Sequence, residues 1–366
     1  MRISKLSLRN FRSYTSLSLS FEDNINIFIG DNAQGKTNIL EAIFLGAIGR
    51  SHRTTSDSDM IQWNEQAAAV DILFHRKDIE NKLSFKLKQE ESKEVLLNNY
   101  PVKLKEIIGS VNIVLFSPED LWLIKGPPSQ RRRFLDIEIS QASPTYYRTL
   151  LQYNRILNQR NHLLKKIRER KASLALLESW DEQLAKTAEF IVIKRLEAIK
   201  KLSMLANLMQ RKLTNSKENL TLIYSQANQE EEVEPPDLYS WYIKAFTELR
   251  EQDILRGSTS IGPHRDDIVL KINEKDVKNF GSQGQQRTGI LALKLAELEF
   301  LKSETGEYPV LLMDDVMSEL DIQRREQLLL FIHERIQTFI TATDSALFPD
   351  IHVGHFYHVN ASTITE

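Results

Sequence analysis

The pattern of apolar and polar positions predicts strands in the first hundred residues. Isoleucine recurs at every second position over 25–29, which favours a buried strand. Residues 1–23 contain two further alternating runs. Residues 67–104 alternate again, and Asn98 and Asn99 accept the positive φ of a tight hairpin turn. We therefore expect antiparallel strands over about 67–104.

The apolar period changes to that of a helix between about residues 131 and 213. Apolar residues recur there three or four positions apart, among many charges and few glycines or prolines. The polar link Lys165–Lys171 predicts the bend of an antiparallel helix pair. A further helix is expected over about 238–251, and the acidic, proline-bearing stretch 229–237 before it is typical of an exposed loop.

The last hundred residues return to alternating helices and strands. We predict a Gly/Gln-rich loop over 280–288, then an apolar helix over 289–301. A buried strand over 308–313, a helix over 322–336 and a strand over 339–344 follow. The chain thus predicts an α/β lobe built from its two ends, with a helical lobe inserted between them.

The predicted strand at 25–29 runs directly into a phosphate-binding pattern. The eight residues that match G-x-x-x-x-G-K-[ST] are Gly30, Asp31, Asn32, Ala33, Gln34, Gly35, Lys36 and Thr37. An apolar helix follows, and this strand–loop–helix context favours a nucleoside triphosphate site over a simple turn with a solvated lysine. Backbone N–H groups would face the phosphates, Lys36 would reach the β- and γ-phosphates, and Thr37 would offer its hydroxyl to Mg²⁺.

Asp314 and Asp315 follow the predicted strand near residue 310. Mg²⁺ beside a phosphate loop takes one or two carboxylates together with waters and phosphate oxygens. Asp314 would hold Mg²⁺, directly or through water, and Asp315 would polarise the attacking water. The alternative is that both aspartates cap the next helix, but Ser318–Asp321 already supplies a cap pattern of the [ST]-x-x-[DE] kind.

A second helix start with an affinity for anions lies at 281–287. Its Ser282 and Gly284 precede the apolar helix predicted over 289–301, so N–H groups would be available to a phosphate there. One chain then has two helix N-termini that could each bind a phosphate, but only one triphosphate. We expect two chains to face each other, each presenting its serine loop to the nucleotide of the other.

Composition excludes several other functions. The 366 residues suffice for two lobes. The absence of cysteine excludes disulfides, thiolate metal sites and a cysteine nucleophile. No apolar run approaches about 18 residues and no signal-peptide block is visible, so we expect a cytoplasmic protein without a membrane span. The net charge of −2 does not by itself indicate nucleic acid, so any DNA contact must come from local basic patches.

The order of these motifs resembles that of ABC-type ATPases. The phosphate loop, Ser282–Gln285, Leu312–Asp315, Ser318–Asp321 and Thr341–Asp344 resemble the Walker A, signature, Walker B, D-loop and switch elements, in that order. Further segments resemble the RecF family, which is related to the SMC and Rad50 proteins, and the resemblance spans nearly the whole chain. These segments are Asn10–Tyr14, Phe116–Leu121, Arg132–Asp136 and Gly262–Arg265.

The resemblance implies an α/β fold in which an ABC-type P-loop ATPase lobe, with mixed sheets and flanking helices, carries an inserted helical lobe. We expect the ATPase lobe over 1–130 and 256–366, and the helical lobe over 131–255. The resemblance also implies ATP and Mg²⁺ as ligands, a homodimer that forms with ATP on DNA, and slow, DNA-stimulated ATP hydrolysis. The implied role is recombinational repair, in which the protein works with RecR and RecO to direct RecA onto single-strand gaps.

The resemblance also assigns roles by position. Lys36, Thr37 and Asp314 would bind nucleotide and Mg²⁺, Asp315 takes the place of the catalytic carboxylate, and Ser282 with Gly284 would contact the γ-phosphate of the partner chain. Two departures from the broader ABC pattern stand out. An aspartate replaces the usual catalytic glutamate, which fits slow turnover, and Thr343 stands where many relatives have histidine, so we assign no catalytic histidine.

Two basic clusters are candidates for contact with DNA phosphates. They are Arg131, Arg132 and Arg133, and the run that begins with Lys165 and Lys166, with Arg50 and Arg53 as weaker candidates. Charge runs on helices are equally typical of solvated faces, so the DNA function rests on the resemblance. An equal alternative for Arg12 is that it faces the nucleotide, and an equal alternative for His264 and Arg265 is a structural corner.

Two rival functions share the phosphate loop. The first is the nucleotide-binding subunit of a membrane transporter, against which the long helical insertion and the lack of a recognisable Q-loop argue. The second is a P-loop small-molecule kinase. The Ser282 loop and Asp315 argue against a kinase, because a kinase needs no trans serine.

Overall fold

A computed structural model describes residues 1–227, 237–348 and 354–365, and the chain divides into two compact units. Unit 1 comprises Met1–Asp120 and Lys294–Glu366, and unit 2 comprises Leu121–Leu293. The predicted exposed loop over 229–237 lies outside the described residues except for its last position. Within the described ranges, no helix is both long and apolar enough to cross a bilayer.

A six-stranded sheet organises unit 1 around the predicted phosphate loop. Its order is β15-β14-β3-β13-β12-β8, and all neighbours pair in parallel except β15, which is antiparallel to β14. The strands are β3 (Ile25–Ile29), β8 (Ile113–Phe116), β12 (Val310–Asp314), β13 (Thr338–Ala342), β14 (His355–Asn360) and β15 (Thr363–Thr365). The parallel order places the end of β3, which leads into the phosphate loop, beside the end of β13.

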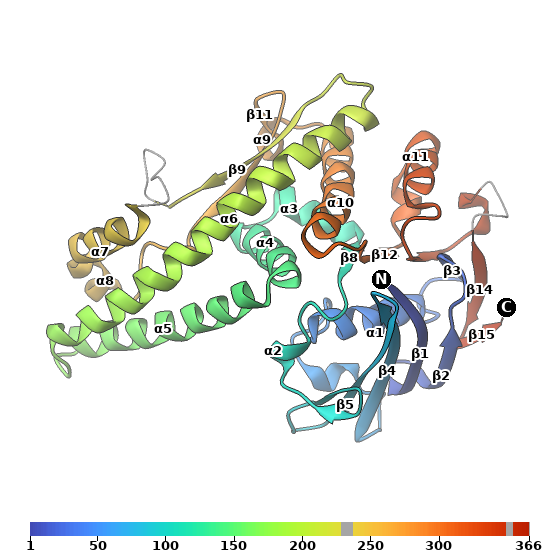
Figure 1. Cartoon of the computed structure of the whole chain (residues 1–366), viewed down its shortest axis with the longest axis horizontal. Helices are drawn as coiled ribbons and strands as arrows, with labels where there is room; N and C mark the ends of the chain where they lie inside the picture. Colours follow the sequence, from blue (N-terminus) through green and yellow to red (C-terminus); the bar gives the residue numbers. More distant parts are fainter. Residues whose placement is uncertain (228–236, 349–353, 366) are drawn as a thin grey trace. The chain divides into compact units, whose positions relative to one another are not determined.

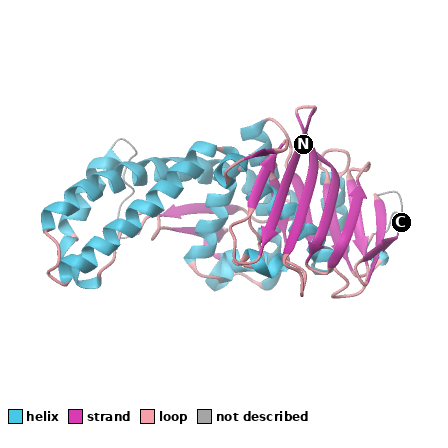
Figure 2. Ribbon diagram, turned by 90° about the horizontal axis from the view of Figure 1, so that it is seen from below, coloured by secondary structure: helices cyan, strands magenta, loops and turns pink. Residues whose placement is uncertain are grey.

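A second, antiparallel six-stranded sheet completes unit 1, and Figure 2 shows its strands side by side. Its order is β2-β1-β4-β5-β6-β7. The strands are β1 (Arg2–Phe11), β2 (Tyr14–Ser20), β4 (Ala67–Arg76), β5 (Ile79–Lys88), β6 (Glu94–Leu97) and β7 (Tyr100–Pro101). The predicted strands over 1–23 and 67–104 are therefore confirmed, and Asn98 and Asn99 take positive φ of 52° and 68° at the β6–β7 turn.

Helix α1 (Lys36–Ile48) packs against strands of both sheets. It is buried nearly all round, as expected for a helix enclosed on two sides. A Cβ on its Gly46 would lie 2.3 Å from Ile72 Cδ1 of β4, so a larger residue there would force the end of the Ile72 side chain to move. The other helices wholly within unit 1 are α2 (Leu104–Ile107) and α11 (Ile322–Ile332).

Unit 2 is built on a long antiparallel pair of helices, α5 (Pro144–Arg168) and α6 (Leu177–Leu213), which run side by side in Figure 1. Their bend lies at 169–176, which confirms the bend predicted near the polar link at 165–171. A three-stranded sheet of order β11-β10-β9 packs with them. The remaining elements are α3 (Trp122–Lys125), α4 (Pro128–Ala142), β9 (Leu220–Ser225), α7 (Leu238–Glu248), α8 (Arg250–Arg256), β10 (Asp267–Ile272), β11 (Lys275–Asp276) and α9 (Val277–Phe280).

Several predicted boundaries need correction. The loop predicted over 280–288 is wrong, because α9 reaches Phe280 and α10 (Gln283–Thr305) begins three residues later. The single helix predicted over 238–251 is two helices, α7 and α8. The helix predicted to reach residue 336 ends at Ile332. Its N-cap is Asp321, which accepts the N–H of Arg324 at 2.9 Å, and not Ser318.

The division into units differs from the predicted lobes at residues 121–130 and, over a longer segment, at residues 256–293. The sequence analysis assigns them to the ATPase lobe, whereas their contacts lie within unit 2. The reason is β-pairing, because β10 is antiparallel to β9 along its whole length. Arg131 adds a second tie, since its guanidinium bonds Asp267 at the start of β10. The predicted signature serine, Ser282, therefore belongs to unit 2.

Buried ion pairs tie the helices of unit 2 together. Arg195 on α6 bonds the Asp136 carboxylate, the hydroxyls of Tyr146 and Tyr224, and the carbonyl of Pro263. A second buried arginine, Arg160, donates hydrogen bonds to Asp181 at 2.7 Å, to Asp253 at 2.8 Å and to the Thr259 hydroxyl at 2.8 Å. Such pairs are costly to break singly, because a buried charge then loses its partner.

Candidate nucleotide site

The predicted phosphate loop connects β3 to α1. No side chain caps the first turn of this helix. Gly35 is the N-cap residue with a φ of 110°, and no side chain accepts a hydrogen bond from the first turn. The Tyr14 hydroxyl supports the loop by donating to the Gly35 carbonyl at 3.3 Å. A helix start of this kind presents free N–H donors and the positive end of its dipole to an anion.

Lys36 lies folded against its own loop. The side chain is only 7% exposed, and its Nζ donates to the carbonyls of Gly30 at 2.5 Å and Asp31 at 2.7 Å. Burial lowers the pKa of Lys36, while the negative charges of Asp315 and Asp314 oppose that shift. The ammonium thus has weak local acceptors that a phosphate could replace.

Thr37 and Asp314 meet, although they are 277 residues apart in sequence. The Thr37 hydroxyl donates to Oδ1 of Asp314 at 2.9 Å, and the buried Thr341 hydroxyl donates to the same oxygen at 2.7 Å. Asp314 ends β12, and Thr341 is its register partner on β13. Parallel pairing therefore places the carboxylate beside the first turn of α1.

Asp315 has an unusual backbone and an unpaired carboxylate oxygen. Its φ is 53°, in the left-handed region, and its N–H donates to the Thr341 hydroxyl at 2.9 Å. Its buried Oδ1 has no hydrogen-bond partner among the described residues. Burial, and after it the charge of Asp314, raises the pKa of Asp315. The backbone therefore turns away directly after the strand, as expected for a carboxylate with a role different from that of Asp314.

The oxygen atoms at this site fit Mg²⁺ rather than a metal held by protein alone. Within the described ranges, no group of three or more His, Cys, Asp or Glu side chains could enclose a metal ion. Thr37 and Asp314 nevertheless bring a hydroxyl and a carboxylate together beside the phosphate loop. Mg²⁺ in such sites takes its remaining ligands from phosphates and water, so the residues present suffice.

The sequence analysis missed a buried carboxylate on the phosphate-loop helix. Glu41 is fully buried, and Arg12 donates two hydrogen bonds to its carboxylate, from Nε at 2.8 Å and from Nη2 at 2.6 Å. Ser51 and Arg53 also bond this carboxylate. Burial by itself would raise the pKa of Glu41, but the bonds from Arg12 and Ser51 and the charges of Arg12 and Arg53 lower it.

The Arg12 guanidinium is engaged by Glu41 in this structure. Glu41 also pairs Arg53, a weaker DNA candidate, within unit 1. The sequence does carry a signal for this buried carboxylate. Glu41 is the one charged residue within an otherwise apolar run, between Leu40 and Ala42.

The other side of the phosphate loop is held by the β14–β15 hairpin. Gln34 accepts hydrogen bonds from two backbone N–H groups of the hairpin turn: Ala361 N–H reaches its side-chain oxygen at 2.5 Å, and Ser362 N–H reaches its carbonyl at 3.1 Å. The loop is therefore braced from both ends of the chain, by Tyr14 and by this turn.

Ser282 and Gly284 are exposed at the start of α10, within unit 2. The Ser282 hydroxyl accepts the N–H of Gln285 at 3.2 Å, and the Gln285 side chain accepts the N–H of Ser282 at 3.0 Å. This reciprocal pair is a capping box, with glutamine as its fourth residue. A side chain at Gly284 would meet open space, since the nearest atom is Ser282 Oγ at 4.0 Å.

The predicted DNA residues differ in their environments. Arg131 is buried, and it bonds Asp267 through two nitrogens and the carbonyls of Leu123 and Gly126 through a third. This removes Arg131 from the predicted DNA surface. Arg132 is half-buried and donates to the Asp266 carbonyl at 2.7 Å, whereas Arg133 is exposed.

Lys165 and Lys166 are both exposed in the last turn of α5, next to the helix bend.

The surroundings of His264 agree with the structural corner that is the alternative for its segment. Its ring is mostly buried, with Nδ1 2.6 Å from the Tyr153 hydroxyl and Nε2 3.2 Å from the Thr259 carbonyl. Burial lowers the pKa of His264 to about 4.

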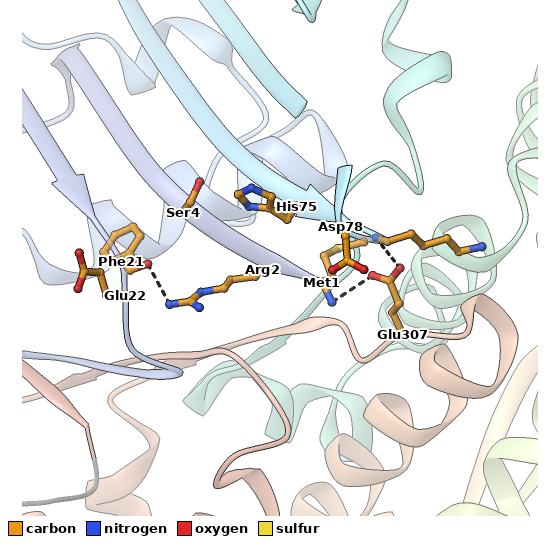
Figure 3. Close-up of a pocket in the computed structure, with 9 residues that line it drawn as sticks. Met1, Arg2, Ser4, Phe21, Glu22, His75, Asp78 and Glu307 are labelled. Atoms are coloured by element: carbon orange, nitrogen blue, oxygen red, sulfur yellow. Dashed lines mark hydrogen bonds and ion pairs between the residues drawn. The ribbon is translucent and has the colours of Figure 1, made fainter. Parts of the chain in front are cut away.

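A separate pocket of about 840 Å³ lies at the edge of unit 1 (Figure 3). Its lining comes from the ends of β1 and β4, the β4–β5 turn and Glu307, and it includes no residue of the phosphate loop. Three interactions join its lining residues: Arg2 donates to the Phe21 carbonyl at 3.3 Å, the Lys77 N–H donates to Glu307 at 2.8 Å, and the Met1 amino group lies 3.1 Å from the Glu307 carboxylate.

Comparison with known proteins agrees with this geometry. Residues 2–362 match the family described as the RecF/RecN/SMC N terminal domain. The DNA replication and repair protein RecF of Alkaliphilus oremlandii is 47% identical over 349 residues, which cover 94% of this chain and 93% of that protein. A solved structure of the recombination mediator protein RecF–ATP in the RecFOR pathway has a TM-score of 0.92 at 38% identity, covering 99% of this chain and 96% of that one.

Similarity to a more distant solved structure shows the class of fold. The Smc head bound to the C-winged helix domain of ScpA has a TM-score of 0.58 at 18% identity, covering 98% of this chain and 94% of that one. The fold is thus that of an ABC-type ATPase head related to SMC proteins, as predicted. Within this class, the chain belongs to the RecF family of DNA replication and repair proteins. Family membership decides against the transporter and kinase alternatives.

Proposed function

We propose that this protein is an ATP-dependent DNA-binding protein of recombinational repair, in which ATP and Mg²⁺ bind at Gly30–Thr37 and switch the chain into a homodimer. The observation that carries the proposal is the 2.9 Å bond between Thr37 Oγ1 and Asp314 Oδ1, which joins two motifs 277 residues apart. A solved relative is described as a complex of RecF with ATP.

The residues of the loop have separate tasks in this proposal. Lys36 exchanges the Gly30 and Asp31 carbonyls for β- and γ-phosphate oxygens, which are stronger acceptors because they are charged. The uncapped N–H groups of α1 bind the phosphates next to it. Thr37 and Asp314 hold Mg²⁺. When bound, this ion neutralises phosphate charge and polarises the phosphoryl oxygens.

Asp315 is the general base in this proposal. Its left-handed backbone separates its carboxylate from that of Asp314, and its Oδ1 has no described partner to compete with a water molecule. Its raised pKa makes it a better proton acceptor as long as it remains ionised. Aspartate is one methylene shorter than the glutamate of many ABC-type ATPases, which is consistent with slow hydrolysis.

Dimerisation uses the exposed start of α10. Ser282 and Gly284 present a hydroxyl and an open backbone at a helix N-terminus, the arrangement that suits a terminal phosphate. In the proposed dimer they contact the γ-phosphate bound by the partner chain. ATP is then part of the interface, so its hydrolysis weakens the dimer.

The dimer clamps duplex DNA near single-strand gaps, with Arg132, Arg133, Lys165 and Lys166 as the candidate phosphate contacts. These contacts give affinity without base specificity and weaken with salt. The proposal places RecR and RecO as partners in directing RecA to the gap. It follows the family resemblance and the RecFOR pathway named for the solved relative.

Sedimentation velocity tests the proposal. The protein is run in Mg²⁺ with ATP, with ADP and without nucleotide, each with and without a short gapped duplex. We expect a dimer that needs ATP and that DNA strengthens. A chain that binds ATP but stays monomeric with DNA present would refute the trans role of Ser282, and a chain that binds no ATP would refute the nucleotide site itself.

A further inference from the structure

We propose that Thr341 is a positioning residue that sets the geometry of both aspartates in the nucleotide site. The inference rests on the proposed function, because it concerns the same site. It deepens that function by assigning a role to a residue outside the phosphate loop and outside the aspartate pair. Thr341 opens the segment that resembles the switch element, but the resemblance assigns no role to its hydroxyl.

The hydroxyl of Thr341 is the junction of a continuous hydrogen-bond chain. It donates to Asp314 Oδ1 at 2.7 Å and accepts the N–H of Asp315 at 2.9 Å. Asp314 Oδ1 also accepts the Thr37 hydroxyl at 2.9 Å. A hydroxyl has one donor and two acceptor positions, so Thr341 can serve both aspartates at once.

Each of these bonds fixes a different property of the site. The bond to Asp314 holds the carboxylate rotamer, so that one oxygen faces the Thr37 hydroxyl. The bond from Asp315 satisfies an N–H that its left-handed backbone, with a φ of 53°, directs at β13. That conformation is strained for an aspartate and persists only where surrounding bonds favour it. Thr341 therefore fixes where the second carboxylate points.

The environment of Thr341 makes this arrangement rigid. Thr341 is 1% exposed at the end of β13, and it is the register partner of Asp314 on β12. Water cannot easily replace a hydroxyl in so closed a position, so its removal leaves the Asp315 N–H without an acceptor. Residues that orient a metal ligand in this way typically change metal affinity or activity by roughly 10–100-fold when they are removed.

Two substitutions separate the hydroxyl from the shape of the side chain. Thr341→Val keeps the branched volume and removes the hydroxyl, whereas Thr341→Ser keeps the hydroxyl. Thr338→Val is the matched control, because Thr338 is also buried on β13 but its hydroxyl donates to the Ile336 carbonyl, at 3.0 Å, rather than to an aspartate of the site. Thr341→Ala replaces the valine variant if that protein does not fold.

The first readout is binding of a fluorescent ATP analogue, titrated with Mg²⁺ and repeated in EDTA. For Thr341→Val we expect the Mg²⁺ concentration at half-saturation to rise roughly tenfold or more, with binding in EDTA unchanged within about twofold. Hydrolysis should fall by a similar factor through kcat, with little change in KM. Thr341→Ser should restore both to within about threefold of wild type, and Thr338→Val should match wild type.

The outcomes distinguish the inference from the proposed function. If Thr341→Val binds Mg²⁺·ATP and hydrolyses it like Thr338→Val, or if Thr341→Ser is as defective as Thr341→Val, the hydroxyl does not position the aspartates and the inference is wrong. If the wild-type protein shows no Mg²⁺-dependent ATP binding at all, the proposed nucleotide site fails instead.

Discussion

Lys36 in unit 1 and Arg195 in unit 2 are both buried cations, 7% and 2% exposed, but their partners differ in kind. Lys36 has two backbone carbonyls of its own loop. Arg195 has a carboxylate, two tyrosine hydroxyls and a carbonyl, drawn from four separate segments. A ligand can displace the partners of Lys36 without unfolding anything, whereas nothing can displace those of Arg195 without separating helices.

The same contrast extends through the two units. Polar groups at the nucleotide site of unit 1 include an uncapped helix start and an unpaired Oδ1 on Asp315. Polar groups around Arg195 are bonded to one another, and this network connects α4, α5, α6 and the Pro263 turn. Burial of charge alone therefore does not identify a ligand site. What distinguishes the nucleotide site is that its hydrogen-bond donors and acceptors are held in place while some of them have no hydrogen-bond partner among the described residues.

The largest effect is expected for Arg195→Ala. It removes a fully enclosed cation and leaves the partly buried Asp136 carboxylate without it, so unit 2 should lose about 3–5 kcal/mol of stability in denaturant unfolding. Arg211→Ala is the matched control, because Arg211 is exposed on the same helix. Equal stabilities of the two variants would show that Arg195 is no more structural than a surface residue.

Lys36→Ala should have the opposite profile. We expect the loss of detectable ATP binding by calorimetry, because the charge-assisted bonds to phosphate disappear. Stability should stay near that of wild type, since only two loop carbonyls lose a donor and they can turn to water. ATP affinity like that of wild type would refute the phosphate-loop assignment, and a large loss of stability would refute the contrast with Arg195.

Asp315→Asn should slow ATP hydrolysis by about 100-fold or more, because an amide cannot accept the proton of the attacking water. ATP binding should persist, so the ATP dimer should live longer in sedimentation or light-scattering decay. Asp321→Asn is the control, since Asp321 is an N-cap that asparagine replaces well. Unchanged hydrolysis in Asp315→Asn would remove this residue from the catalytic role.

Ser282→Arg tests the surface of unit 2 that we assign to the γ-phosphate of the partner chain. The long cation should block approach of the partner chain, so dimerisation with ATP should weaken by more than about tenfold while the monomer still binds ATP. Ser282→Ala separates this effect from loss of the helix cap, which costs only about 1 kcal/mol. An intact Ser282→Arg dimer would contradict the trans contact.

The smallest effect concerns pH and His264. Its folded pKa, about 4, lies below the ordinary value of 6.5, so the unfolded chain takes up the proton first as pH falls. Stability from this group is complete above pH 6.5 and is lost progressively from there to about pH 4. Between pH 7 and 6 the loss is about 0.7 kcal/mol. In His264→Gln this component of the slope should vanish, and an unchanged slope would exclude His264 as its source.

The parts of the fold that follow a local period could be predicted from the sequence. The β3–loop–α1 unit, the β-hairpins of the antiparallel sheet and the α5–α6 pair are all confirmed, because each has a repeating apolar pattern or a turn residue at its boundary. The start of α10 was missed, because its first two turns are rich in glycine and glutamine and lack apolar residues.

The candidate site divides in the same way. The meeting of Thr37 and Asp314 could be anticipated, since a phosphate loop and a strand-end carboxylate serve one ligand. The Glu41 cluster, Thr341 and the burial of Arg131 could not. Each depends on strands and helices from distant parts of the chain, and no short motif records which side chain faces which. Arg131 shows this most clearly, because within Arg131–Arg133 only the structure separates the buried arginine from the exposed one.

The position of β3 in its sheet has a consequence for synthesis of the protein. This strand ends at Ile29, but both of its neighbours, β13 and β14, come from residues 338–360. A ribosome must therefore translate nearly the whole chain before β3 has a partner on either edge. Until then its apolar residues are available to chaperones or to aggregation. A nascent chain truncated before residue 338 would carry the intact phosphate-loop sequence and still lack the sheet that shapes it.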